Sequence, residues 1–562
     1  MAGRDYNVRF TPRGLADAFD STDVFPGACK ILQNLIFDQS NPELVVARPG
    51  VGAPFFDFAG TGGIWGGPFT WGQPGLVWGG TSFASATGIT VQITIGNFVY
   101  GMISTNDFPG HDVPFVFEVG VGLIPITGVT LVNTPVTQST AGDWTPPTMA
   151  VIGIKLIVTH PGFTLPLAFG VIDLTNPLAP TWTAQNTTVN LLPSVPTSVS
   201  NFNNRAWYAC GNLIFYSDVL TPTVMTNAGQ ALTVGDRTPI IGQAGLPIST
   251  TSTGVIAALI VFKQFSIWQI LGDAAITGTL SINFLSLNIG TLSPRAIYQT
   301  PIGIIFINID GPFTVNPLGG VGPLTKDQSK LNQDLQAPFQ AIINPSRAAA
   351  AFTGSVYRVC LDTVISGTQT TVDYWFDITR RRWTGPHTFP YDTISQFGNS
   401  FLISDRFIGA QLFLSDYITT ASSTYVDNGI SNTVILQSSS LPKTQNINEK
   451  QVVESTIEIG SIANNTTYNV SALVESGETL NQTQLVVNNP NLLWGGGAIW
   501  GGGGLWSSST NRPKTRTIAW TAPLVFKKFE LQVIAQSASN LSIGTFFAKY
   551  QDTGYTNQQV GS

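Results

Sequence analysis

Short apolar or alternating segments recur along this chain from about residue 81 to residue 425, and turn-forming residues separate them. Val, Ile, Phe and Thr dominate the segments, while Pro, Gly, Asn and Asp stand between them, as at residues 89–100, 205–216 and 401–414. Segments of this length and composition favour β-strands. The 57 glycines and 35 prolines among 562 residues oppose long helices. The sequence therefore predicts an all-β protein.

Several of these segments group into larger units, each with short strands joined by tight turns. The units cover residues 205–218, 255–273, 293–315, 350–383 and 397–416. Units of several strands that start roughly every forty to fifty residues are typical of β-propeller blades. We predict that residues 81–425 form one β-propeller of six or seven blades, in which successive strands of a blade pair antiparallel.

The regions on either side of the predicted propeller differ from it. Residues 1–80 are interpreted as an N-terminal extended segment with a Trp-Gly insertion. Its first part, 1–50, is irregular, and there 28–37 fits a helical turn or a strand and Arg48-Pro49-Gly50 marks a turn. Residues 426–562 are rich in Ser, Asn, Gln and Thr and contain alternating runs. We predict a separate C-terminal β-sandwich-like domain there.

Two tryptophan–glycine segments, one in each flanking region, share the same W-G-G spacing. They lie at residues 64–80 and 494–506 and contain six of the thirteen tryptophans, namely Trp65, Trp71, Trp78, Trp494, Trp500 and Trp506. Glycine gives the backbone freedom, and tryptophan adds large apolar area. Such segments suit a packed contact inside one domain, a seam between subunits or an exposed tip. Because they flank the propeller, we expect them to lie next to each other, and we treat these tryptophans as interface candidates.

Charged residues make up only 10% of the chain, against about 25% in typical soluble proteins. The net charge of −6 and the pI of about 5.1 differ from the basic footprint of a protein that grips nucleic acid. Two short basic clusters, Arg380-Arg381-Arg382 and Lys527-Lys528, suit a solvated face or a pair between subunits better than a phosphate site. Arg380, Arg381 and Arg382 are therefore further interface candidates.

The three cysteines, Cys29, Cys210 and Cys360, are widely spaced and odd in number. Neither a metal site nor a disulfide framework can be read from them, and they resemble small buried hydrophobic residues. The N-terminus lacks the apolar core of a signal peptide. The longest apolar stretch, residues 255–271, is interrupted by Lys263 and by polar residues and does not fit a membrane span.

Motifs of catalysis are missing from the sequence. The three histidines, His111, His160 and His387, stand in Pro/Gly turn contexts without metal-binding neighbours. The glycine-rich stretches lack the lysine of a phosphate-binding loop, and no nucleophile elbow is found.

A propeller glycosidase would need converging carboxylates. The acidic residues available for this are Asp310, Asp362, Asp373 and Asp377. Acidic residues at blade turns usually accept hydrogen bonds from backbone N–H groups instead. We predict that the chain is not an enzyme and has no catalytic residue, cofactor or metal.

Three groups of motifs resemble the tail nozzle proteins of short-tailed phages, also called tail hub or packaged-DNA stabilisation proteins. The first comprises F-T-P-R-G-L-A-D-A-F-D, F-P-G-A-C-K-I-L-Q-N-L-I-F and A-R-P-G, within residues 10–50. The second is L-I-V-F-K-Q-F-S-I-W-Q-I-L-G-D at residues 259–273. The third comprises G-T-L-S-P-R-A-I-Y and I-I-F-I-N-I-D-G-P-F-T-V, within residues 290–315. The Trp-Gly segments have no counterpart in this pattern.

The resemblance implies a homo-hexameric ring below the portal and adaptor rings of a virion. Its propellers would surround the DNA exit channel, and the nozzle would retain packaged DNA until ejection. The implied partners are other copies of the chain, the tail adaptor protein, tail fibre or tail tip proteins, genomic DNA without sequence-specific binding, and the host envelope. Few cations along the channel suit this role, because phosphate contacts would hold the duplex.

Two alternatives remain open. One is a propeller-headed receptor-binding or fibre protein of a phage, which would usually be three-fold. The other is a propeller hydrolase that acts on cell-surface glycan.

Overall fold

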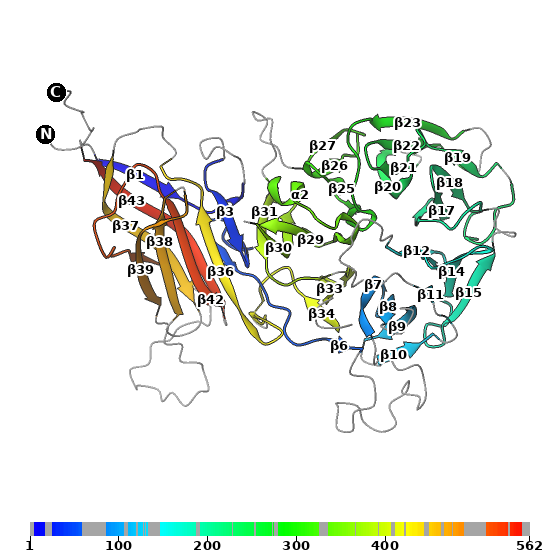
Figure 1. Cartoon of the computed structure of the whole chain (residues 1–562), viewed down its shortest axis with the longest axis horizontal. Helices are drawn as coiled ribbons and strands as arrows, with labels where there is room; N and C mark the ends of the chain where they lie inside the picture. Colours follow the sequence, from blue (N-terminus) through cyan, green and yellow to red (C-terminus); the bar gives the residue numbers. More distant parts are fainter. Residues whose placement is uncertain are drawn as a thin grey trace, which may run out of the picture.

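A computed structural model shows a ring of small β-sheets beside a second β-domain, as Figure 1 illustrates. Among the described residues the helical elements are short, namely η3 (Pro294–Ala296), α2 (Ala337–Gln340) and η4 (Pro345–Arg347). None of these helices is long and apolar enough to cross a membrane. The structure describes residues 5–16, 25–58, 86–105, 111–119, 122–126, 129, 131–132, 146–186, 192–227, 229–251, 254–272, 274, 279–324, 335–365, 367–391, 393–405, 411–420, 423–442, 449–461, 466–474, 476–487, 513–537 and 540–553.

The ring consists of four-stranded antiparallel units, which we number as blades in chain order. Blade 1 contains β7 (Ala86–Ile95), β8 (Phe98–Thr105), β9 (His111–Glu118) and β10 (Gly122–Pro125), with β11 (Leu131–Val132) also paired to β9. Blade 2 contains β12 (Thr148–Ile152), β13 (Lys155–Thr159), β14 (Leu167–Asp173) and β15 (Thr181–Asn186). Blade 3 contains β16 (Ser198–Phe202), β17 (Arg205–Cys210), β18 (Leu213–Tyr216) and β19 (Ala231–Thr233).

The second half of the ring repeats this plan. Blade 4 contains β20 (Ile240–Thr251), β21 (Gly254–Lys263), β22 (Ile267–Leu271) and β23 (Ser281–Ser286). Blade 5 contains β24 (Tyr298–Thr300), β25 (Gly303–Asn308), β26 (Gly311–Val315) and β27 (Val321–Pro323). Blade 6 contains β28 (Ala349–Thr353), β29 (Val356–Ile365), β30 (Thr368–Asp377) and β31 (Arg382–His387). Blade 7 contains β32 (Thr393–Phe397), β33 (Ser400–Asp405), β34 (Gln411–Ser415) and the N-terminal strand β6 (Phe56–Asp57).

The first strands of the blades form the inner circle of the ring. Strands β7, β12, β16, β20, β24, β28 and β32 contact one another in that order, and β32 returns to β7. Six blades are separate sheets, and the blade 6 unit continues into the sheet of the second domain. The prediction of a propeller with six or seven blades is confirmed, as is the antiparallel pairing of successive strands within a blade.

Two segments far apart in the sequence close the ring. Strand β6 pairs with β34 as the outer strand of blade 7, so residues 56–57 complete a sheet whose other strands begin at Thr393. Phe58 is fully buried in the cluster between blades 7 and 1, with Phe115 of β9 and Leu402 of β33. Similar apolar clusters lie between other neighbouring blades, because each blade buries both faces. For example, the rings of Phe262 and Phe306 lie 5.1 Å apart between blades 4 and 5.

The second domain contains two sheets built from both ends of the chain. One sheet contains β1 (Asp5–Phe10), β4 (Leu35–Phe37), β5 (Val45–Ala47), β37 (Lys450–Ser461), β40 (Lys514–Thr517), β41 (Val525–Phe526) and β43 (Leu541–Asp552). The other contains β2 (Gly14–Leu15), β3 (Ala28–Gln33), β35 (Val426–Asp427), β36 (Ile430–Ser438), β38 (Thr466–Leu473), β39 (Thr479–Val487) and β42 (Glu530–Ser537). Strand β1 pairs antiparallel with β43, so the first and last described strands lie side by side (Figure 1).

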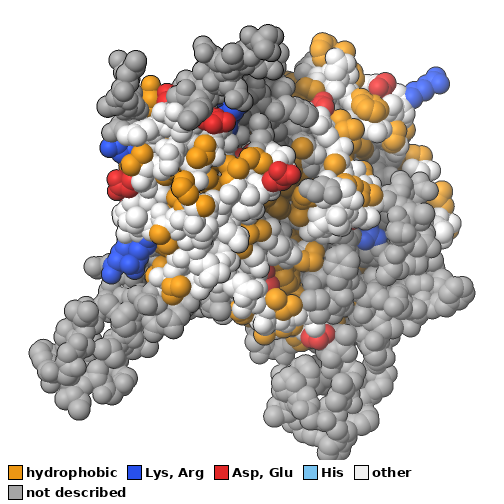
Figure 2. Space-filling model, turned by 60° about the vertical axis from the view of Figure 1, so that its left-hand side comes forward, with side chains coloured by type: hydrophobic (Ala, Val, Ile, Leu, Met, Phe, Trp, Pro, Cys, Tyr) orange, Lys and Arg blue, Asp and Glu red, His pale blue; other side chains and the backbone are white. Residues whose placement is uncertain are grey.

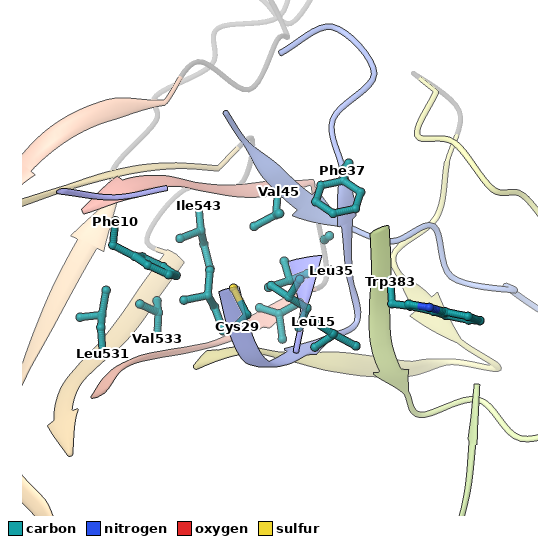
Figure 3. Packing of buried hydrophobic residues seen from close by; sticks show 14 of the residues in the cluster. Phe10, Leu15, Cys29, Leu35, Phe37, Val45, Trp383, Leu531, Val533 and Ile543 are labelled. Atoms are coloured by element: carbon teal, nitrogen blue, oxygen red, sulfur yellow. The ribbon is translucent and has the colours of Figure 1, made fainter. Parts of the chain in front are cut away.

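One hydrophobic cluster fills this domain and reaches into blade 6. Figure 3 shows Phe10, Val45 and Ile543 from the first sheet facing Cys29 and Val533 from the second. Trp383 of β31 belongs to the same cluster and is fully buried. The described parts of the predicted N-terminal segment, 5–16 and 25–58, are therefore strands of the second domain and of blade 7. Residues 28–37 form β3 and β4 rather than a helical turn.

Candidate functional site

The basic cluster Arg380-Arg381-Arg382 lies at the turn between β30 and β31. Arg380 donates a hydrogen bond to the main-chain carbonyl of Asp38 at 2.6 Å. The guanidinium carbon of Arg382 lies 4.1 Å from the centroid of the Phe25 ring. Arg381 is exposed and has a left-handed φ of 53° at the turn. The structure thus uses Arg380 and Arg382 to bind the N-terminal segment to blade 6 within one subunit.

The six candidate tryptophans are Trp65, Trp71, Trp78, Trp494, Trp500 and Trp506, and all lie outside the described residues. The chain leaves the described structure after Phe58, just beyond β6, and returns at β7. It leaves again after β39 and returns before β40. The expected proximity of the two Trp-Gly segments stays a prediction.

A buried ion pair joins the N-terminal segment to the start of the second domain. Arg48 and Asp427 are both buried, and the guanidinium donates to both carboxylate oxygens, with Nη1 at 3.1 Å from Oδ1. Arg48 Nε donates to Asn34 Oδ1 at 2.9 Å, and the main-chain N–H of Val51 donates to Asp427 at 3.1 Å. The A-R-P-G motif, expected to mark a turn, therefore supplies a buried arginine at the joint between the two domains.

A second buried arginine links blades 6 and 7. Arg358 donates from Nε and Nη2 to Asp373 at 3.2 and 2.6 Å, and from Nη1 to Ser415 of blade 7 at 2.7 Å. Its guanidinium lies 4.4 Å from the ring centroid of Trp375, whose Nε1 also donates to Asp373 at 2.6 Å. The Tyr391 hydroxyl donates to the same carboxylate at 3.0 Å. The carboxylate is thereby fully engaged and buried.

His387 is close enough to both arginines to feel their charge. Its ring is fully buried and packs edge-on against Trp375, with centroids 4.9 Å apart. Burial, reinforced by the positive charges of Arg48 and Arg358, holds the pKa of His387 well below its ordinary value. The imidazole is therefore neutral at physiological pH. Its Nε2 lies 3.3 Å from the Thr384 hydroxyl, which is itself buried.

A histidine–aspartate pair joins blades 1 and 2. His160 Nε2 lies 2.7 Å from Asp112 Oδ2, and both side chains are fully buried. The main-chain N–H of Gly162 donates to His160 Nδ1 at 2.9 Å, which assigns the ring proton to Nε2. The Thr90 hydroxyl also donates to Asp112, at 3.3 Å. A catalytic dyad would present a free ring nitrogen to substrate, whereas both nitrogens here are bonded inside the protein.

Arg295 reaches from blade 5 across the middle of the ring. It lies in η3, and its Nη1 donates to the main-chain carbonyl of Thr90 in β7 at 3.0 Å. Its Nη2 donates to the carbonyl of Arg347 in η4 at 3.0 Å. Blades 5 and 1 are not neighbours in the ring, so this side chain crosses the propeller centre.

Three of the four acidic residues considered for a glycosidase have carboxylates that other side chains of the protein bind. Asp377 pairs with Arg380 at 2.8 Å. Asp362 accepts hydrogen bonds from Thr371 at 2.6 Å and from Asn344 at 3.1 Å. Asp373 is bound to Arg358, as described above. The remaining one, Asp310, lies in the turn between β25 and β26, where its main-chain N–H donates to Asn308 Oδ1 at 3.0 Å.

A groove between blades 4 and 5 has a volume of about 580 Å³. Its lining is uncharged and includes Leu246, Pro247, Tyr298, Pro301 and Pro317. Burial raises the pKa of Tyr298, so its hydroxyl stays protonated. This groove offers neither an acid–base pair nor an activated nucleophile.

Sulfur and metal chemistry are also unsupported in the described part of the chain. Cys29, Cys210 and Cys360 are buried and form no disulfide, and burial raises the pKa of Cys210 to about 11. No three His, Cys, Asp or Glu side chains among the described residues are grouped to bind a metal ion. The buried polar groups described above therefore connect blades and domains.

Sequence reasoning missed the roles of Arg48, Arg295 and Arg358. One signal was present, because each arginine stands alone next to apolar or turn residues, in A-R-P-G, S-P-R-A-I and V-Y-R-V-C. A lone charge in such a setting is rarely buried unless it is paired. The identity of the partners, up to 379 positions away in sequence, carries no such signal.

No protein-family model and no curated protein matches the chain. Among solved structures it is similar to a puromycin hydrolase mutant complexed with PGG, at 11% identity and a TM-score of 0.36, over 63% of this chain and 59% of the hydrolase. The chain thus matches about three fifths of that protein's length. It is also similar to the β-propeller domain of the Trilobed protease from Pyrococcus furiosus, at 9% identity and a TM-score of 0.32, over 59% of this chain and 96% of that domain.

A third similar structure is the SapL1 lectin in complex with alpha methyl fucoside, at 12% identity and a TM-score of 0.28, over 53% of this chain and 95% of the lectin. Identities and scores this low carry no argument about function. The propeller assignment rests on the strand pairing and on the closed circle of inner strands.

Proposed function

We propose that this protein is a structural component of a phage tail nozzle. In this role it forms part of the DNA exit channel below the portal and adaptor rings, and it retains packaged DNA until ejection. It would act in the virion as a homo-hexamer without catalytic activity. Its neighbours would be the tail adaptor protein and tail fibre or tail tip proteins, with the host envelope at the distal end.

The observation that carries the proposal is the position of the motifs behind the resemblance. Arg48 of the first motif group lies at the joint between the domains. Lys263 of the second is fully buried and donates to Asp236 Oδ1 at 2.9 Å, which fixes the end of β21 to the segment before β20. Arg295 of the third crosses the propeller centre. Residues from all three motif groups therefore hold parts of the two domains together. This distribution favours an architecture shared with the nozzle proteins over a chance similarity of surface loops.

The position of Arg295 restricts where DNA could pass. Duplex DNA is about 20 Å across, judging from its groove dimensions. A propeller centre crossed by one side chain cannot admit it. A channel for DNA would therefore run between copies of the chain, with the propellers around it, as the resemblance implies.

The sparse charge supports the same role. On the face shown in Figure 2, charged side chains are few and scattered among uncharged ones. A wall with few Lys and Arg side chains makes few phosphate contacts, so the duplex is not held by a salt-dependent attraction. Interfaces in permanent assemblies are likewise depleted of charge at their cores.

The mass of the assembled protein in solution tests the proposal. Light scattering on the purified chain should give a particle of six times the 60.0 kDa of one subunit. A stable trimer would favour the fibre alternative and contradict a nozzle. A chain that stays monomeric at every concentration would contradict it as well.

A further inference from the structure

One buried side chain, Asn34, connects three parts of the chain at the joint between the propeller and the second domain. It lies in the turn between β3 and β4. Its Oδ1 accepts hydrogen bonds from Arg48 Nε at 2.9 Å and from the main-chain N–H of Thr388 at 3.2 Å. Its Nδ2 donates to the main-chain carbonyl of Thr433 in β36 at 2.8 Å. The N-terminal segment, the end of blade 6 and the second domain therefore meet at this residue.

His387 directly precedes Thr388 and ends β31. Blade 6 joins the sheet of the second domain in the same strand, where Gly385 pairs with Leu32. The imidazole is fully buried, and its Nδ1 has no hydrogen-bond partner in the described part of the chain. A neutral imidazole with its proton on Nε2 carries no hydrogen on Nδ1, whereas an imidazolium donates from both nitrogens. Protonation would therefore bury an N–H group that has no acceptor, which is costly.

The other groups near His387 that bear or can bear charge are bound to one another. They are Arg48 on the N-terminal segment, Arg358 and Cys360 on β29, Asp373 on β30, Tyr391, and Asp427 on β35. Each of the two carboxylates is paired with one of the two arginines. Burial, together with repulsion from the arginines, holds the pKa of His387 well below its ordinary value. A proton on the imidazole would add a third buried cation without a carboxylate of its own.

We propose that the joint is a pH-sensitive switch, in which protonation of His387 releases blade 6 from Asn34 and from the second domain. The imidazolium turns out to solvent, and Thr388 moves with it because the two residues are adjacent. The opening is local, since blades 3 and 4 are held together by their own apolar cluster, which includes Trp207 and Leu259. This inference goes beyond the proposed function and holds for any assembly of the chain.

The closed and open joints differ in their affinity for a proton. In the closed joint the pKa of His387 lies well below its ordinary value, and in the open joint the exposed imidazole regains a value of about 6.5. The closed joint is therefore favoured in full above pH 6.5 and weakens as the pH falls below that value. The ratio of open to closed joints should rise about tenfold per pH unit, which is about thirtyfold at pH 5.

Hydrogen exchange measured by mass spectrometry between pH 7.5 and pH 5 tests the switch, after correction for the intrinsic effect of pH on exchange. Peptides from β3, β4 and β36 should lose protection about thirtyfold at pH 5. Peptides from blades 3 and 4, which contain no histidine, should keep theirs. His387→Phe should abolish the response of the joint peptides, and His387→Gln serves if the phenylalanine variant fails to fold.

His160→Gln is the matched control, because His160 is also fully buried and a glutamine amide can still donate to Asp112. This variant should keep the pH response of the joint peptides. Equal loss of protection in the joint and in blades 3 and 4 would mean global unfolding and would overturn the proposal. An unchanged joint at pH 5, or a full response in the His387 variants, would overturn it as well.

Discussion

Arg358 is bound on all sides by groups from blades 6 and 7. Its carboxylate partner, Asp373, also accepts hydrogen bonds from Trp375 and Tyr391. A buried charge of this kind is stable only while its partner is present. Arg358 therefore holds blades 6 and 7 together. The boundary between two blades is where a ring of sheets can open.

Replacing Arg358 with Met should destabilise the protein by about 3–5 kcal/mol, because Asp373 would remain buried without its cation. Urea denaturation followed by tryptophan fluorescence measures the change. Adding Asp373→Asn to the same chain should restore part of the loss, since the uncompensated charge is then gone. A cost below about 1 kcal/mol for Arg358→Met would mean that the pair is not buried as described.

The buried His387 should make the free energy of unfolding depend on pH. Its folded pKa is depressed by burial and by Arg48 and Arg358. The stability it contributes is therefore present above the unfolded pKa of about 6.5 and is lost as pH falls below that value. The free energy of unfolding should fall by about 1.4 kcal/mol per pH unit below pH 6.5 because of this one proton.

A His387→Phe variant keeps an aromatic ring beside Trp375 and removes the titration. Its stability should fall less steeply than that of the wild type between pH 6.5 and 5, as measured by denaturation at a series of pH values. Equal slopes for the two proteins would show that His387 does not resist protonation in the folded state.

At the scale of elements, the closure of the propeller depends on a two-residue strand. Strand β6 completes blade 7, and the Gln411 side chain donates to Asp57 at 2.8 Å across this pairing. Because the chain then enters blade 1, the same short segment joins the last blade to the first. Two phenylalanines anchor the segment, since Phe58 is fully buried in the cluster between blades 7 and 1 and Phe56 packs against it.

Phe58→Ala should cost about 3–5 kcal/mol through the cavity it leaves between blades 7 and 1. Phe265→Ala is the matched control, because Phe265 lies in the turn between β21 and β22 of blade 4, is 61% exposed and leaves no cavity. Hydrogen exchange should rise in blades 7 and 1 of the first variant and stay low in blade 4. If exchange in the Phe58→Ala variant rose equally in every blade, Phe58 would not stabilise the boundary of blades 7 and 1 selectively.

The sequence predicted elements well where contacts are local. The run at 205–218 predicted short strands joined by a tight turn, and β17 and β18 pair across Gly211 and Asn212. Pairings over long separations could not be predicted, because no local pattern encodes a partner. Strand β1 pairs with β43, and β3 joins β36, so the second domain contains strands from both ends of the chain. The placement of Arg380 and Arg382 against the N-terminal segment escaped prediction for the same reason.

At the scale of the whole molecule, the two domains form one continuous frame. Blade 6 shares a sheet with the second domain through the pair Leu32 and Gly385. Arg48 and Asp427 join the same region from the other side. A frame of this kind suits a protein that must keep its shape inside a large assembly under pressure from packaged DNA, which is the role that we propose.

The arrangement of copies around a central axis tests the nozzle proposal most directly. Electron microscopy of the assembled protein should show six copies, with propellers around an axial channel wider than the roughly 20 Å of duplex DNA. Each propeller centre should be closed at the level of Arg295. A three-fold particle, or six copies around a closed axis, would contradict the account.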